Sequence, residues 1–105
     1  MTQKDYKIAK ELKERLAKVV QLVDFRIFGS RARGEAEEYS DMDVFIEAEH
    51  IDKGLEDNIY HIAWEVGLEY SVFISPLVFS RYEIVDSPLR VSPIVKNIEE
   101  EGVKI

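Results

Sequence analysis

Two carboxylates, Asp41 and Asp43, stand one residue apart near the middle of the sequence. The apolar residues 44–46 follow them, which predicts a β-strand that begins at this pair. Successive side chains of a strand point to opposite faces, so the two carboxylates would project from one face about 7 Å apart. Carboxylate oxygens at this spacing suit a hard divalent cation such as Mg²⁺, which often shares its coordination shell with the phosphates of a nucleotide.

Residues that suit phosphate binding precede these carboxylates. Gly29 and Ser30 follow an apolar run, and ten residues separate Ser30 from Asp41. A glycine allows a positive φ or a close backbone approach, and Ser30 offers a hydroxyl and backbone N–H groups where a short helix would begin. The two groups of residues together predict a site for a metal-bound triphosphate.

The arrangement Gly-Ser, ten residues, Asp-x-Asp resembles the signature of the polymerase-β-like nucleotidyltransferase superfamily. More narrowly, the run Gly-Ser-Arg-Ala-Arg-Gly-Glu at 29–35 and the small size resemble the minimal nucleotidyltransferases (MNT) of prokaryotes. These are often the antitoxin of a pair with a HEPN-domain ribonuclease toxin. The specific residues cover 29–47, and looser similarity extends to the C-terminus.

This resemblance implies an activity and its participants. A Mg²⁺-dependent enzyme would transfer AMP from ATP to a tyrosine hydroxyl of a HEPN toxin. Asp41 and Asp43 would be the catalytic, metal-binding residues, and Gly29 and Ser30 would hold the β- and γ-phosphates.

Two arginines beside the Gly-Ser turn, Arg31 and Arg33, are candidate nucleotide-binding residues. A guanidinium group matches phosphate oxygens, and the resemblance implies that one or both lie near the nucleotide or an acidic neighbour. The alternative is an exposed ion pair on a short helix, which contributes little to stability. The acidic residues available for such pairs are Glu35, Glu37 and Glu38.

A third carboxylate on a neighbouring strand completes the superfamily pattern, and this sequence departs from it. The predicted third strand region, 68–79 with a bend at Pro76, has Ser71 or Phe73 where relatives carry the aspartate. Glu69 is the acid of this segment and a possible substitute. Without a third carboxylate the enzyme would be slow, would depend on its partner to activate the nucleophile, or would bind nucleotide without catalysis.

Hydrophobic periodicity predicts the elements that must position these residues. Apolar residues three and four positions apart predict helices, apolar runs predict strands, and capping signals at Ser80 and Ser92-Pro93 predict two short helices. The expected helices are 5–20 and 51–66, and the first two strands are 22–28 and 43–48. Trp64 is interpreted as a packing residue of the second helix.

These elements predict an α/β fold with a small mixed sheet of three or four strands and helices mainly on one face. The site would lie on the exposed side of the sheet, where Phe45, Tyr70 or Phe73 would be partly exposed unless a nucleotide or a partner covers them. We expect one minimal nucleotidyltransferase domain over 1–105.

Composition limits the class of partner. The 105-residue chain has a net charge of −7, and no basic face of the kind that binds the nucleic-acid backbone is evident in the sequence. Direct nucleic-acid binding is therefore disfavoured. Absence of cysteine excludes disulfides and thiolate metal sites. No apolar run is long enough for a membrane span and no signal segment is evident, which predicts a cytoplasmic protein. The small size predicts a partner chain, such as a HEPN protein, or a homo-oligomer.

Two functions from different classes remain open. The first is the nucleotidyltransferase described above. The second is a catalytically weak or inactive nucleotide-binding antitoxin or regulatory module that neutralises its partner by contact. A transferase that inactivates small molecules is disfavoured because no second domain is available to form an acceptor pocket.

Overall fold

A four-stranded mixed sheet forms the centre of the chain in the computed structural model, which describes residues 1–105. The strands lie in the order β3-β2-β1-β4. β1 pairs antiparallel with β2 and with β4, and β2 pairs parallel with β3. Their bounds are Leu22–Phe28 (β1), Met42–Ala48 (β2), Ile74–Ser80 (β3) and Val103–Lys104 (β4).

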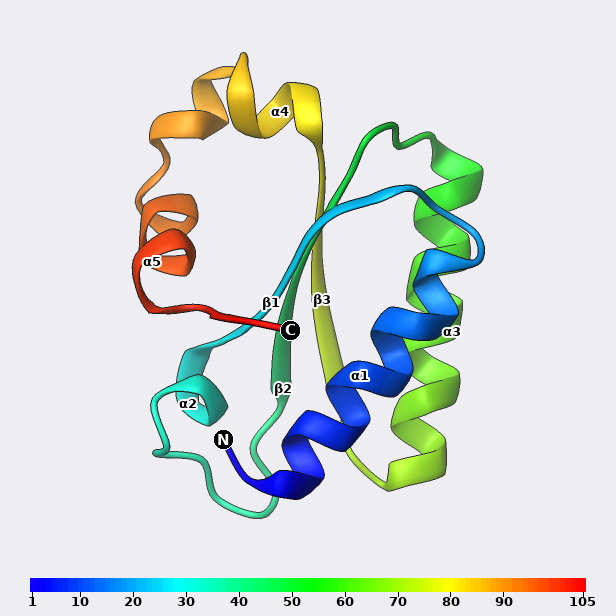
Figure 1. Cartoon of the computed structure of the whole chain (residues 1–105), viewed down its shortest axis with the longest axis vertical. Helices are drawn as coiled ribbons and strands as arrows, with labels where there is room; N and C mark the ends of the chain where they lie inside the picture. Colours follow the sequence, from blue (N-terminus) through cyan, green and yellow to red (C-terminus); the bar gives the residue numbers. More distant parts are fainter.

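Two long helices, α1 (Gln3–Ala17) and α3 (Lys53–Tyr70), cover one side of the sheet (Figure 1). The short elements on the other side are α4 (Arg81–Val85), η1 (Pro88–Val91) and α5 (Pro93–Glu101). A single helical turn, α2 (Gly29–Ala32), follows β1. The α/β fold with a mixed sheet is confirmed. None of the helices combines the length and the hydrophobicity needed to cross a membrane.

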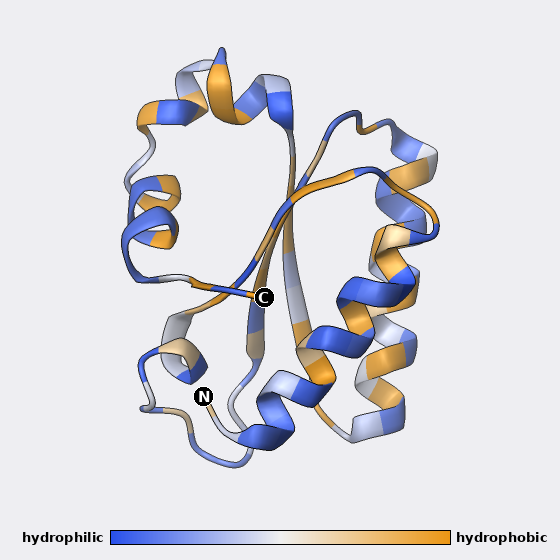
Figure 2. Ribbon diagram, viewed as in Figure 1, coloured by the Kyte–Doolittle hydropathy of each residue, from blue (hydrophilic) through white to orange (hydrophobic).

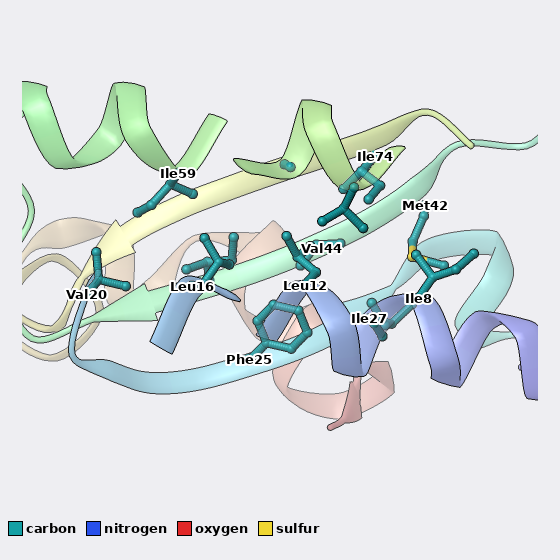
Figure 3. Close-up of a cluster of buried hydrophobic side chains, with 14 of the residues drawn as sticks. Ile8, Leu12, Leu16, Val20, Phe25, Ile27, Met42, Val44, Ile59 and Ile74 are labelled. Carbon is teal, nitrogen blue, oxygen red and sulfur yellow. The ribbon is translucent and has the colours of Figure 1, made fainter. Parts of the chain in front are cut away.

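The main core lies between the sheet and the two long helices (Figure 3). Alternate residues of β1 and β2 point into it, as the period of two predicts, and α1 contributes a stripe at intervals of four. Hydrophobic and hydrophilic residues accordingly alternate along α1 and α3 in Figure 2. Buried members of this core include Ile8, Leu12, Leu16, Phe25, Ile27, Val44, Ile46 and Ile59.

The opposite face of the sheet is partly covered by the chain itself. Phe45 is only 2% exposed, and its ring lies 5.8 Å from the ring of Phe79, centroid to centroid. Val95 and Ile98 of α5 are also buried on this side. Of the three aromatic residues expected to be partly exposed, Phe45 is instead buried, whereas Phe73 is 69% exposed and Tyr70 is half-buried. In Figure 1, α4 and α5 lie toward one end of this face and α2 toward the other.

The helix boundaries differ from those predicted. α1 begins at Gln3 because Thr2 and Asp5 form a reciprocal capping box. α3 continues to Tyr70 and ends at Ser71, which adopts a left-handed conformation with φ 55°. The segment after residue 67 that was predicted to start the third strand is therefore helical, and β3 begins only at Ile74.

Candidate functional site

The Gly-Ser turn and the Asp-x-Asp pair meet at one point in the structure. β1 and β2 are antiparallel neighbours, and their register places Phe28 opposite Asp43. The next residue, Gly29, has φ +73°, a conformation that favours glycine. A Cβ atom at Gly29 would collide with Oδ2 of Asp43. The absent side chain of Gly29 thus makes room for a carboxylate that is distant in sequence.

Asp41 and Asp43 interact electrostatically. Asp41 is exposed just before β2, and Asp43 is partly buried on the face of the sheet that carries Phe45. Burial raises the pKa of the Asp43 carboxyl group, and repulsion from Asp41 raises this pKa further. A cation between the two carboxylates would relieve both effects.

Arg33 is the basic residue next to this pair. Its positive charge partly offsets the rise in the pKa of Asp43. Its side chain is 44% exposed and contacts Glu35 at 3.0 Å and Glu101 at 3.9 Å. The pair with Glu35 matches the alternative considered from the sequence. Exposed ion pairs of this kind are weak, so the guanidinium group remains available to an anionic ligand.

Arg31 is engaged inside the protein. Its Nη1 donates to Oδ1 of Asp5 at 2.7 Å, and its Nη2 donates to the backbone oxygen of Ser40 at 2.6 Å. The Arg31 side chain is 11% exposed. The resemblance allowed an acidic neighbour as the partner of an arginine of this turn, but no signal in the sequence identified Asp5 as that neighbour. Arg31 fixes the residue immediately before Asp41 to the start of α1.

Asp5 is a residue of this region that sequence reasoning missed. Burial alone would raise its pKa, but hydrogen bonds from the Thr2 N–H and from Arg31 hold the pKa below its usual value. Its spacing from Thr2 was a signal for a helix start. No local pattern could connect it with Arg31, because the two residues lie 26 positions apart.

The placement predicted for Glu69, a candidate third carboxylate on a strand, is wrong. Glu69 belongs to α3, and its carboxylate accepts from Nη2 of Arg15 on α1 at 2.7 Å. Ser75 is the β3 residue in register with Asp43, and β3 contains no acidic residue. The neighbouring strand therefore supplies no carboxylate to the Asp41–Asp43 pair.

The donor set suits Mg²⁺ only together with a nucleotide. No group of three or more His, Cys, Asp or Glu side chains is arranged to hold a metal ion. Two carboxylates are nevertheless a normal protein contribution to a Mg²⁺ site, because phosphate and water oxygens fill the remaining positions. The first N–H groups of the α2 turn have no partner within that turn, so they can donate to phosphate oxygens.

Comparison with known proteins decides the family. The nucleotidyltransferase domain model matches residues 6–105. This chain belongs to the nucleotidyltransferase family. A relative from Methanocaldococcus jannaschii, named as a putative protein adenylyltransferase, is 35% identical to this nucleotidyltransferase over 95 residues, which are 90% of this chain and 83% of the relative.

Solved structures agree with the family assignment. A crystal structure from Sulfolobus solfataricus, named as a putative nucleotidyltransferase, aligns with a TM-score of 0.54 and 25% identity over 93% of this chain and 76% of that chain. A complex of a tri-AMPylated HEPN toxin from Shewanella oneidensis with its MNT antitoxin aligns with a TM-score of 0.57 and 16% identity, covering 99% of this nucleotidyltransferase and 71% of that chain. The latter similarity shows the fold alone.

Proposed function

We propose that this chain is a Mg²⁺-dependent nucleotidyltransferase that transfers AMP from ATP to a protein hydroxyl group, with a tyrosine of a HEPN-type ribonuclease toxin as acceptor. The close approach of Gly29 and Asp43 carries the proposal, because it joins the two motifs in one site beside Arg33. The name of the Methanocaldococcus relative and the AMPylated toxin bound by the Shewanella antitoxin support the same chemistry.

The transfer forms one bond and breaks one. The phenolic oxygen of the acceptor attacks the α-phosphorus of ATP, and the bond from that phosphorus to the oxygen shared with the β-phosphate breaks. Pyrophosphate leaves with the bonding electrons, and the phenolic proton passes to water. Bound Mg²⁺ would neutralise phosphate charge as it develops.

The chain's own residues would position the reactants. Asp41 and Asp43 hold the metal-bound nucleotide. Ser30 and the first N–H groups of α2, which lack a partner within that turn, would orient its terminal phosphates. The Arg33 guanidinium group balances negative charge on the side of Asp43.

A second candidate function is a nucleotide-binding antitoxin that neutralises its partner by contact. The lack of an acidic residue in β3 favours this alternative, because a third carboxylate would otherwise assist deprotonation of the acceptor. In that case ATP binds and is not consumed.

The deciding experiment mixes the purified protein, Mg²⁺, α-³²P-labelled ATP and the product of the adjacent gene. Asp41→Asn/Asp43→Asn removes the paired carboxylates. Glu37→Gln/Glu38→Gln is the matched control, because it removes the same charge from the loop before them.

We expect label on the partner protein with the wild type and the control and none with Asp41→Asn/Asp43→Asn. Mass spectrometry should then locate AMP on a tyrosine. Bound ATP and a stable complex without label would contradict the enzyme and support the contact antitoxin.

A further inference from the structure

An open groove of about 640 Å³ lies between the C-terminal half of α3 and the start of β3. Tyr60, Trp64 and Leu68 stand along one wall at intervals of four residues, which places them on one side of the helix. Phe73 and Pro76 contribute to the opposite wall. The groove therefore runs along the helix beside an edge strand of the sheet.

The apolar side chains of this groove are unusually exposed for their size. Phe73 is 69% exposed, Leu68 60%, Trp64 59% and Tyr60 41%. The interpretation of Trp64 as a packing residue of its helix is therefore wrong. Isolated exposed hydrophobic residues are normal, but several gathered in one concave patch mark an interaction site. Trp and Tyr are also the residues that most often dominate interface energies.

The groove adjoins the candidate active site. Ser75 lines it and is in register with Asp43 on the parallel neighbour β2. One residue earlier on β2, the N–H of Met42 donates to the carbonyl oxygen of Phe73 at 2.9 Å. A protein seated in the groove would thus lie one strand away from the carboxylate pair.

We propose that this groove docks the acceptor protein through a basic amphipathic helix, whose apolar side packs against Trp64 and Phe73. This proposal rests on the function proposed above, because that function identifies the docked protein as the acceptor. Docking here places the acceptor hydroxyl over Ser75 and next to Asp43.

Charge selects a basic helix over a second copy of the chain. The whole chain has a net charge of −7. On α3, Asp57 pairs with Lys53 and Glu69 pairs with Arg15, but Glu56 and Glu65 have no Lys or Arg partner. Two copies that met through this surface would bring like charges together, whereas Lys and Arg on a partner helix would meet opposite charge.

The local backbone favours a helix over an added strand. β3 is an edge strand, but Pro76 in its middle has no N–H group to offer a further strand. On α3, Ala63 and Gly67 line the floor of the groove and are buried, and a Cβ at Gly67 would meet the Val72 carbonyl oxygen. A partner helix would therefore pack on the exposed side chains of Tyr60, Trp64 and Leu68.

The test uses two synthetic amphipathic helical peptides of about 16 residues with the same apolar stripe. One carries Lys and Arg beside the stripe, and the other carries Glu. Fluorescence anisotropy gives the Kd of each for the wild type, for the groove variant Trp64→Ser/Phe73→Ser and for the control Val85→Ser/Val91→Ser. The control removes exposed apolar side chains from α4 and η1 on the other side of the sheet.

We expect the basic peptide to bind the wild type and the control equally and the groove variant about tenfold more weakly or worse. The acidic peptide should not bind. Equal affinity of the basic peptide for the groove variant, or equal binding of the acidic peptide, would overturn the proposal. A wild-type dimer that the groove substitutions abolish, measured by light scattering, would assign the groove to a second copy and would also overturn it.

Activity measured on the same proteins separates this proposal from the function on which it rests. With the adjacent gene product as acceptor, the groove variant should show a higher KM for that protein and an unchanged affinity for Mg²⁺–ATP. If the wild type binds the basic peptide in the groove but never transfers AMP, the enzymatic function fails and the docking surface stands. If transfer is normal in the groove variant, the docking surface fails and the enzymatic function stands.

Discussion

Substitution of Gly29 should have two effects, strain in the backbone and displacement of the Asp43 carboxylate. Gly29 and Gly34 share φ +73°, but only Gly29 has a carboxylate where a Cβ would lie. Alanine at either position should destabilise the fold by about 1 kcal/mol, because an L-residue is strained at positive φ. Gly29→Ala should also displace Asp43 and weaken Mg²⁺–ATP binding about tenfold or more, measured by calorimetry.

Gly34→Ala is the control for this experiment, since nothing lies within 4 Å of its added methyl group. It should lose stability and keep nucleotide affinity. Equal nucleotide affinity of the two variants would show that the contact between Gly29 and Asp43 has no part in binding.

The two arginines of the turn should respond in opposite ways. Arg31→Ala leaves Asp5 buried without its ionic partner, so we expect a loss of about 3 kcal/mol in the free energy of unfolding. Arg33→Ala removes an exposed side chain and should change stability by less than about 0.5 kcal/mol. Arg33→Ala should instead weaken ATP binding, because in our proposal Arg33 lies beside the nucleotide and Arg31 does not contact it. Urea titration and calorimetry on both variants test this division.

A double-mutant cycle between Arg31 and Asp5 isolates their interaction. The single variants of the cycle are Asp5→Asn and Arg31→Gln. The double variant Asp5→Asn/Arg31→Gln should be more stable than the sum of their losses in the free energy of unfolding predicts, because no uncompensated charge remains buried. Additive losses would mean that the ion pair is not the source of the effect.

The strand β2 carries a second acidic residue whose ionisation should affect stability. Glu47 is 6% exposed, and burial, followed by the nearby charge of Asp24, raises its pKa, while Arg81 and Arg26 lower it in part. A carboxyl group whose pKa is higher in the folded protein than in the unfolded chain stabilises the fold at pH values below its unfolded-state pKa. This contribution is lost as the pH rises through its folded-state pKa. Glu47→Gln should therefore raise the Tm at pH 7.

The gain from Glu47→Gln should shrink as the pH falls toward about 4, where the wild-type side chain is protonated as well. Thermal unfolding from pH 4 to 8 measures this trend. Glu49→Gln is the control, since Glu49 is exposed next to the same strand and approaches Arg81 at 3.8 Å. A gain independent of pH would point to packing and not to charge.

The elements show which features local sequence determines. The first strand, the α2 turn and the start of the second strand were predicted because an apolar run, a Gly-Ser turn and an Asp-x-Asp pair are local signals. The end of α3 was missed because the residues around Tyr70 suit a strand as well as a helix. The helix ends there through a left-handed serine at 71, a position without the glycine that normally marks such an end.

Two site features depend on tertiary packing that no local pattern encodes. The identification of Gly29 and Asp43 as parts of one site required only the motif. The use of Arg31 for a buried contact depends on α1, which crosses the sheet in a position that its own periodicity does not specify. Likewise, the exposure of Trp64 follows from where the edge of the sheet lies.

At the level of the whole molecule, the sheet has two different edges. β3 is long and bears the apolar groove, while β4 is a two-residue strand that covers part of β1. The backbone N–H of Ile105 also donates to the carbonyl oxygen of Phe25 at 3.2 Å, and the Ile105 side chain packs against the main core. The last residues therefore protect an edge that would otherwise be free to pair with another chain.

Deletion of residues 103–105 should expose this edge of β1. We expect a loss of about 2 kcal/mol from the hydrophobic and hydrogen-bond contacts removed, together with concentration-dependent association. Urea unfolding and light scattering measure the two effects. Lys104→Ala is the control, because it keeps the backbone pairing and changes only an exposed side chain. A deletion variant with wild-type stability would show that β4 is dispensable.

The two contacts of Arg31 limit how the sequence of this protein can evolve. Its contact before the carboxylate pair is with a main-chain oxygen, which every amino acid at position 40 would supply. Its other contact is with a side chain at position 5. Sequence drift should therefore be wide at position 40, within the needs of its own turn, whereas positions 5 and 31 can change only together. A library of variants at positions 5, 31 and 40, selected for folded protein, would measure this difference. Residue types at position 40 should vary independently, whereas those at positions 5 and 31 should be correlated.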